Sequence, residues 1–156
     1  MNIDAPHAAL LEQPARRFDH DRRPGEICLT AVELVEIGGD RLVHEDLHDS
    51  NVLAADRQPW LAIDPKPVAG EWAYAVAPIV WNRPDAAARA TSLRTHVRLR
   101  AEIVADTAGL DLERVGAWTL FRLVLNAVDA AEFAPASDEF RGRMIALAKA
   151  FTDPLV

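Results

Sequence analysis

Residues 42–53 read LVHEDLHDSNVL and place two histidines, three acidic side chains and one asparagine between apolar residues. Polar groups at this density are often turn residues whose side chains bond the backbone. His44 and His48 stand four residues apart, so on a helix they could bind one metal ion. The strand-like residues on either side predict a loop instead, and no third nitrogen or sulfur ligand lies nearby in the sequence. The stretch therefore needs a second signal before it indicates chemistry.

The second signal is the spacing of the polar groups. His44, Asp46 and Asn51 reproduce the H-x-D-L-x-x-x-N pattern of a kinase catalytic loop, and Asp64 follows an apolar run further along. Phosphoryl transfer needs a carboxylate that orients the attacking hydroxyl group and accepts its proton. It also needs an amide oxygen and a second carboxylate that hold Mg²⁺ on the nucleotide phosphates. In that order, the pattern predicts Asp46 as the catalytic base and Asn51 and Asp64 as the metal ligands.

The segment HEDLHDSNVL, followed by WLAIDPKPVAGEWAYAVAP, resembles the aminoglycoside and hydroxyurea antibiotic-resistance kinase family, in particular its streptomycin 6-kinase-like branch. The resemblance is strongest over residues 42–84. It implies a protein-kinase-like fold, ATP and Mg²⁺ as cofactors, and transfer of phosphate to an alcohol group of a small antibiotic. It also implies that His44 braces the loop and that Lys66, in the DPK typical of this branch, binds the cofactor near its phosphates. A surface cation explains Lys66 nearly as well.

Two positions depart from the pattern of the family. Where the family usually reads AYD, this sequence reads Ala73-Tyr74-Ala75, so it lacks a carboxylate that would bond the catalytic-loop backbone. Loss of such a group leaves buried donors unpaired, at a cost of about 1–3 kcal/mol. Glu45 stands where the family favours glycine, and a positive φ at that position would strain a glutamate.

Kinases of this type bind ATP between a β-rich N-lobe, which carries a glycine-rich loop and a phosphate-binding lysine, and a helical C-lobe. No lysine precedes Lys66 in this sequence. The residues before His44 contain no G-x-G-x-x-G motif, and their only glycines are Gly25, Gly38 and Gly39. We therefore expect the N-lobe to be missing from this chain, and the chain by itself to have little or no kinase activity.

The alternative is a non-catalytic kinase-lobe remnant or a small-molecule binding protein. Such a protein could hold a cationic ligand on Glu71, Asp129 or Glu132. A solvated surface is the simpler explanation of these three acids, because charged side chains are mostly exposed.

Composition bounds the class of protein. A chain of 156 residues, half of them hydrophobic, forms one domain with a buried core. The net charge of -7 argues against a nucleic-acid partner and permits a cationic small-molecule partner, which by the resemblance would be an antibiotic. The single cysteine, Cys28, excludes an intrachain disulfide and a cysteine-rich metal site. The N-terminus is too polar for a secretory signal and no apolar run is long enough to span a membrane, so we expect a cytoplasmic protein without a membrane partner.

Hydrophobic periodicity and the resemblance together predict an α+β fold that is predominantly α, a protein-kinase-like C-lobe with a small β hairpin at the catalytic loop. We expect a loose N-terminal arm over residues 1–25 and the kinase-like lobe over residues 26–156. The expected elements are a helix over 26–37, strands over 41–45, 51–55 and 59–64, an irregular stretch over 65–84, and helices over 85–108, from 111, and from 137 or 138.

The predicted helices carry apolar stripes that should be buried. The helix that begins near residue 111 should be central, because apolar side chains cover much of its circumference. Without an N-lobe, apolar surface of the hairpin and of the 26–37 helix would be uncovered, so we expect self-association. The stripes are Leu93, Val97, Ala101, Val104 and Ala108 in the 85–108 helix; Trp118, Phe121, Leu125 and Val128, extended by Leu120, Val124 and Ala131, in the next; and Phe140, Met144, Leu147 and Phe151 in the last.

Overall fold

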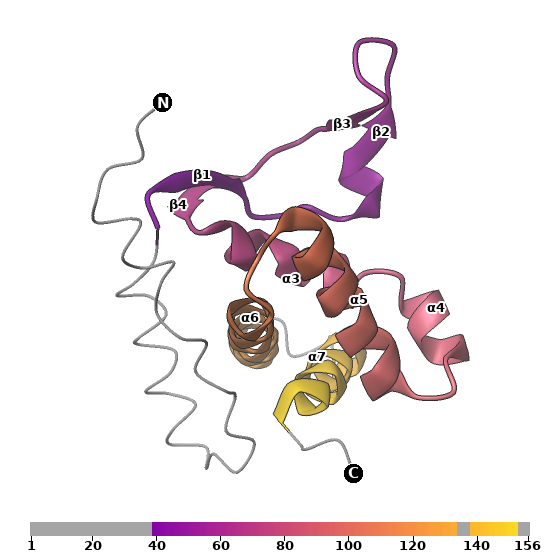
Figure 1. The fold of residues 1–156 in the computed structure, drawn as a ribbon. Helices are drawn as coiled ribbons and strands as arrows, with labels where there is room; N and C mark the ends of the chain where they lie inside the picture. Colours follow the sequence, from indigo (N-terminus) through magenta and orange to yellow (C-terminus); the bar gives the residue numbers. More distant parts are fainter. Residues whose placement is uncertain (1–38, 134–137, 153–156) are drawn as a thin grey trace.

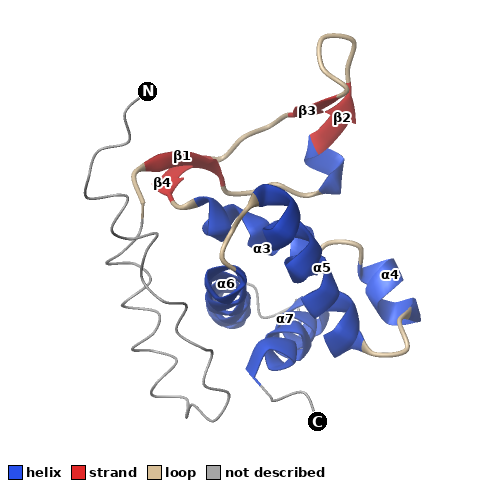
Figure 2. Ribbon diagram, viewed as in Figure 1, coloured by secondary structure: helices blue, strands red, loops and turns tan. Residues whose placement is uncertain are grey.

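The computed structural model describes residues 39–133 and 138–152, which are coloured along the chain in Figure 1. The arm predicted over residues 1–25 and the helix predicted over 26–37 lie outside these ranges. In the described part, short strands form two small sheets on one side of a group of helices (Figure 2). The fold is therefore α+β and mostly helical, as the periodicity predicts.

Both sheets are antiparallel pairs of short strands. β1 (Arg41–His44) pairs with β4 (Pro67–Gly70), and β2 (Val52–Ala54) pairs with β3 (Trp60–Ala62) as the predicted hairpin. β4 lies in the stretch expected to be irregular, and that prediction is wrong. Its sequence, PVAG, carries little strand signal, and the strand forms because β1 offers a partner that is distant in the sequence.

The same stretch contains two further elements that the periodicity did not predict. They are a 3₁₀ helix, η2 (Trp72–Val76), and a short helix, α3 (Ala77–Trp81). Proline at its second position, where the backbone N–H has no partner within the helix, suits the start of α3.

The single helix expected over 85–108 is also wrong, because the structure has two helices there. α4 (Pro84–Arg89) ends before α5 (Leu93–Ala108) begins. The Ser92 side chain caps α5 by accepting a hydrogen bond from the Thr95 amide, so this serine starts a new helix. α5 ends at Ala108, where the predicted helix ends, and is capped by Gly109, which has a φ of 64° that glycine adopts without strain.

The last two helices begin where the sequence predicts. α6 (Leu112–Phe133) follows Asp111, whose carboxylate caps it by accepting a hydrogen bond from the Arg114 amide. α7 (Asp138–Thr152) packs along α6 and α5. None of the helices in the described ranges is both long enough and apolar enough to cross a bilayer.

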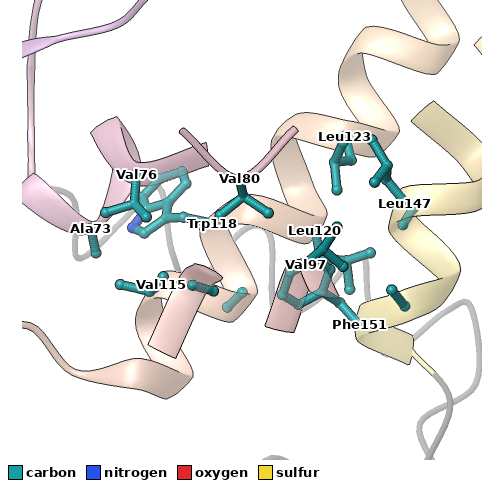
Figure 3. Packing of buried hydrophobic residues seen from close by; sticks show 14 of the residues in the cluster. Ala73, Val76, Val80, Val97, Val115, Trp118, Leu120, Leu123, Leu147 and Phe151 are labelled. Carbon is teal, nitrogen blue, oxygen red and sulfur yellow. The ribbon is translucent and has the colours of Figure 1, made fainter. Parts of the chain in front are cut away.

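The core lies between these helices and η2. In Figure 3, Leu120 of α6, Val97 of α5 and Phe151 of α7 meet in one apolar cluster, to which Leu123 and Leu147 also belong. Three of the four α7 positions predicted to be buried are buried: Met144, Leu147 and Phe151. This core carries the hydrophobic stabilisation of the described part of the chain.

The buried face of α6 differs from the predicted one. Trp118 and Leu120 are buried, but Leu125 and Val128 are 44% and 53% exposed. Apolar residues occupy most of the circumference of this helix, so periodicity cannot select the face that meets α5 and α7. Four other positions of the predicted stripes are exposed as well: Ala108, Val124, Ala131 and Phe140.

Candidate active site

The candidate catalytic loop connects β1 to β2 and is tied at both ends to strand termini. The Glu45 amide donates to the Lys66 carbonyl at 3.0 Å, directly after β1. At the other end, the Ile63 amide donates to the Asn51 carbonyl at 2.9 Å. The two small sheets therefore fix where the loop begins and where it ends.

Both ring nitrogens of His44 bond to protein groups. Its Nδ1 accepts a hydrogen bond from the Asp46 amide at 3.2 Å, so its Nε2 carries the hydrogen that is donated to the Ile63 carbonyl at 3.0 Å. His44 links the loop backbone to the chain just after β3. Because neither nitrogen is left for a metal ion, the pair of His44 and His48 is not a zinc site.

Asp46 is partly exposed and forms an ion pair. Lys66 Nζ donates to Asp46 Oδ2 at 2.6 Å, and 61% of the Lys66 side chain is exposed. The hydrogen bond from Lys66, with the positive charge of that lysine, holds the pKa of Asp46 below its usual value. The same bond raises the pKa of Lys66. Asp46 is thus ionised at neutral pH, the state in which a carboxylate accepts a proton.

Asn51 is one of the few buried polar side chains in the described part. Its Nδ2 donates to the Asp46 carbonyl at 2.9 Å and lies 3.3 Å from His48 Nε2. These contacts orient the amide, and within the described residues its Oδ1 accepts no hydrogen bond. An oriented, unbonded amide oxygen is a suitable Mg²⁺ ligand.

Asp64 follows directly after Ile63, the residue that is bonded to both His44 and Asn51. It has a φ of 51°, a left-handed conformation that Asp adopts more readily than most residues. Its side chain is exposed, with no hydrogen bond or ion pair among the described residues. The described ranges hold no group of three His, Cys, Asp or Glu side chains that could bind a metal ion. An amide oxygen and one carboxylate nevertheless fit Mg²⁺, which commonly takes its remaining ligands from water and substrate phosphates.

The predicted site residues are therefore joined in two ways. Asp46 contacts Asn51 and Lys66 directly, whereas Asp64 is connected to them through the backbone of Ile63. His48, considered at first only as a metal ligand, also belongs to the site, because its Nε2 lies 3.8 Å from Asp46 Oδ1. Its other ring nitrogen is buried with no partner in the described part of the chain.

Sequence reasoning missed the contacts that join the loop to the helical body. Tyr74 Oη donates to Glu45 Oε1 at 2.7 Å, and Arg122 of α6 donates to the Glu45 carbonyl at 2.8 Å. Glu45 does not have a positive φ, so the strain that a glutamate would suffer there is absent. Further along the loop, the Asn82 side chain donates to Asp49. The only sequence signal for Arg122 is an arginine inside an apolar run, FRLVL.

One of the three acids considered for a cationic ligand is already paired. Arg114 donates to both carboxylate oxygens of Glu71, at 2.7 and 2.6 Å, and the Trp118 indole donates to the same group. Neither a ligand site nor a solvated surface describes Glu71, so both predictions are wrong for this residue. Asp129 and Glu132 are exposed on α6, as a solvated surface predicts.

The chain is similar to two streptomycin 6-kinases and a hydroxyurea phosphotransferase over most of its length. It is 40% identical over 121 residues to a streptomycin 6-kinase of Streptomyces glaucescens. The aligned residues cover 78% of this chain and 38% of that protein. It is 42% identical over 109 residues to a hydroxyurea phosphotransferase of Kitasatospora aureofaciens, with 69% and 30% covered. A streptomycin 6-kinase of Streptomyces griseus is 43% identical over 99 residues, with 62% and 31% covered. No solved structure gives a significant match.

The chain spans less than two fifths of the length of each of these relatives. The family model for aminoglycoside/hydroxyurea antibiotic resistance kinases matches residues 15–133, which include both sheets, the candidate catalytic loop and the helices through α6. A match over this much of the chain shows the family: the chain belongs to the aminoglycoside/hydroxyurea antibiotic resistance kinases.

Proposed function

We propose that this protein transfers phosphate from ATP, with Mg²⁺, to a hydroxyl group of a small cationic antibiotic. The observation that carries the proposal is the ionised Asp46, on a loop with kinase spacing, in direct contact with Asn51 and Lys66. Family membership supports the phosphotransferase class. The helical part would be the equivalent of a kinase C-lobe, in a protein that we place in the cytoplasm.

In this mechanism Asp46 is the general base. The oxygen of the acceptor hydroxyl forms a bond to the terminal phosphorus of ATP, and the bond between that phosphorus and the ADP oxygen breaks. The proton of the acceptor hydroxyl passes to Asp46 Oδ1. Lys66 occupies only the other oxygen, Oδ2. The geometry therefore leaves one Asp46 oxygen for the acceptor while Lys66 holds the carboxylate ionised.

Asn51 and Asp64 would hold Mg²⁺ through Asn51 Oδ1 and the Asp64 carboxylate. Bound there, Mg²⁺ would supply positive charge that neutralises the nucleotide phosphates. Lys66, whose side chain is mostly exposed, would donate a second N–H to a phosphate oxygen while it keeps its bond to Asp46 Oδ2. His44 would keep the loop in place through its two hydrogen bonds.

The alternative of a non-catalytic binding protein has weaker support. It requires acids that are free to bind a cation, and Glu71 is engaged by Arg114 and Trp118. Nothing in the geometry of the described residues selects Asp129 or Glu132 as ligands.

The test measures ATP consumption in the presence of streptomycin, for the chain and for Asp46→Asn. We expect little turnover from the chain alone, because its 156 residues contain no G-x-G-x-x-G motif to cover the phosphates. Whatever turnover occurs should fall about 10²–10⁴-fold in Asp46→Asn, the usual contribution of a general base. Asp56→Asn, at an exposed position between β2 and β3, is the matched control. Turnover that survives in Asp46→Asn would contradict the assignment of the base.

A further inference from the structure

Arg122 is a charged residue in the middle of the longest helix of the described part, α6, and only 8% of it is exposed. A cation taken out of water is costly unless other groups replace its hydration. Within the described ranges, no carboxylate forms an ion pair with Arg122. The groups in direct contact with this charge are therefore carbonyls and aromatic rings, and the charges of Glu45 and Asp46 act on it from further away.

Two carbonyls and two rings surround the guanidinium group. One nitrogen donates to the Glu45 carbonyl at 2.8 Å, and another donates to the Tyr74 carbonyl at 3.1 Å. The guanidinium carbon lies 4.3 Å from the centre of the Tyr74 ring and 5.1 Å from that of the Trp81 ring. Only the flat, forked head of an arginine makes two directed bonds and stacks on rings at the same time.

These contacts act on the residue that precedes the proposed base. The Glu45 carbonyl and the Asp46 amide share one planar peptide group, so a bond that fixes the carbonyl also fixes the amide. That amide donates to His44, while the Glu45 side chain accepts from the Tyr74 hydroxyl. Arg122 thus holds one side of this peptide group and His44 holds the other.

We propose that Arg122 is a positioning residue that sets the orientation of the Glu45–Asp46 peptide group, and with it the Asp46 side chain. The link to catalysis rests on the proposed function, whereas the link to loop geometry does not. Arg122 forms no hydrogen bond with Asp46 or with a proposed metal ligand, so its directed contacts reach the loop through Glu45 and Tyr74.

The first measurement is amide hydrogen exchange in Arg122→Met, which removes the charge and the fork but keeps an apolar stem. The amides of Glu45, Asp46 and Asn51 are hydrogen-bonded in the structure and report on the loop. In the variant these amides should exchange about ten- to a hundredfold faster than in the native chain, with the buried Leu147 of α7 as the internal reference. This is the factor expected when hydrogen bonds from a charged donor are lost. Arg98→Met is the matched control, because Arg98 of α5 donates to the Ala150 carbonyl of α7.

The second measurement uses Tyr74, the only tyrosine of the chain, whose titration can be followed by one labelled NMR signal. Burial, then the hydrogen bond to Glu45, raises the pKa of Tyr74, while the charge of Arg122 lowers it. Arg122→Met should therefore raise this pKa further, and Arg98→Met should leave it unchanged. Tyr74→Phe keeps the ring but loses the hydroxyl, and it should accelerate exchange at Glu45 and Asp46 less than Arg122→Met does.

The outcomes separate this inference from the proposed function. Loop-specific acceleration with a raised Tyr74 pKa supports the inference, even in a chain that shows no turnover. Equal acceleration of the loop and of Leu147, or none in the loop, overturns it. Where turnover is measurable, Arg122→Met should lower kcat with little change in KM for ATP, and Arg122→Lys should restore only part of the rate because it lacks the fork.

Discussion

The candidate catalytic loop with its two small sheets and the helical body are stabilised by different kinds of contact. Among residues 39–72, only Val43 and Asn51 are buried, and directed polar bonds hold the loop. The helical body instead has a continuous apolar core. Apolar packing tolerates small shifts, whereas hydrogen bonds specify positions to a few tenths of an ångström. The difference indicates that the helices supply stability and the loop supplies geometry.

The largest effect on stability should come from the helical body. Leu123 of α6 has no exposed surface and packs in the hydrophobic core between the helices. Leu123→Ala should therefore lower the free energy of unfolding by about 2–5 kcal/mol. The exposed Leu125, on the same helix, is the control, and Leu125→Ala should change it by no more than about 0.5 kcal/mol. Urea unfolding measures both variants. Equal losses would show that α6 has no preferred buried face.

A smaller loss is expected where the two regions meet. Glu71→Gln would leave Arg114 and the Trp118 indole without their carboxylate, at a cost of about 1–3 kcal/mol. Asp129→Asn, at an exposed position of α6, should have little effect in the same urea experiment. A Glu71→Gln variant as stable as the native chain would mean that the Glu71 carboxylate is available to a ligand after all.

Within the loop, the expected effect is a change of protonation with little change of stability. Lys66→Met removes the bond that lowers the pKa of Asp46, so this pKa should rise toward its usual value of 3.8. A carboxylate whose pKa is lower in the folded chain stabilises the fold above its unfolded pKa, and it loses that contribution as the pH falls through the folded pKa. The native chain should therefore exceed Lys66→Met in stability at neutral pH, and the difference should vanish below the pKa of Asp46. NMR titration of Asp46 measures the shift, and an unchanged pKa would show that Lys66 does not bind this carboxylate in solution.

The smallest effect concerns the exposed apolar side chains of the strands. Leu42 is 78% exposed and Trp60 is 69% exposed, and uncovered apolar surface promotes association. We predict weak self-association, seen as an average mass that increases with concentration in sedimentation equilibrium. The double variant Leu42→Gln and Trp60→Gln should shift this increase to higher concentration. A constant monomer mass in the native chain would rule it out.

Local chemistry made part of this structure predictable. The β2–β3 hairpin, the Asp111 cap of α6 and the end of α5 at Gly109 follow from residues that act over a few positions. The spacing of the loop likewise identified residues that are linked by direct contacts, Asp46 and Asn51 among them.

The errors arose where distant residues decide the outcome. β4 exists only through its pairing with β1, and the buried face of α6 depends on its packing against α5, α7 and the more distant η2. The contact of Arg122 with the Glu45 carbonyl spans 77 positions of the chain. Such contacts leave no periodic signal in a single sequence, and they are the ones that join the loop to the helical body.

The most direct test of the central claim locates the metal ion on the chain. Mn²⁺ accepts the same oxygen ligands as Mg²⁺ and broadens the NMR signals of nearby nuclei, even when binding is weak. With ATP present, we predict that broadening appears first at the amides of Asn51 and Asp64, and that Asp64→Asn reduces it at both. Broadening centred on Asp129 and Glu132, or broadening that leaves Asn51 unaffected, would contradict a phosphotransfer site at this loop.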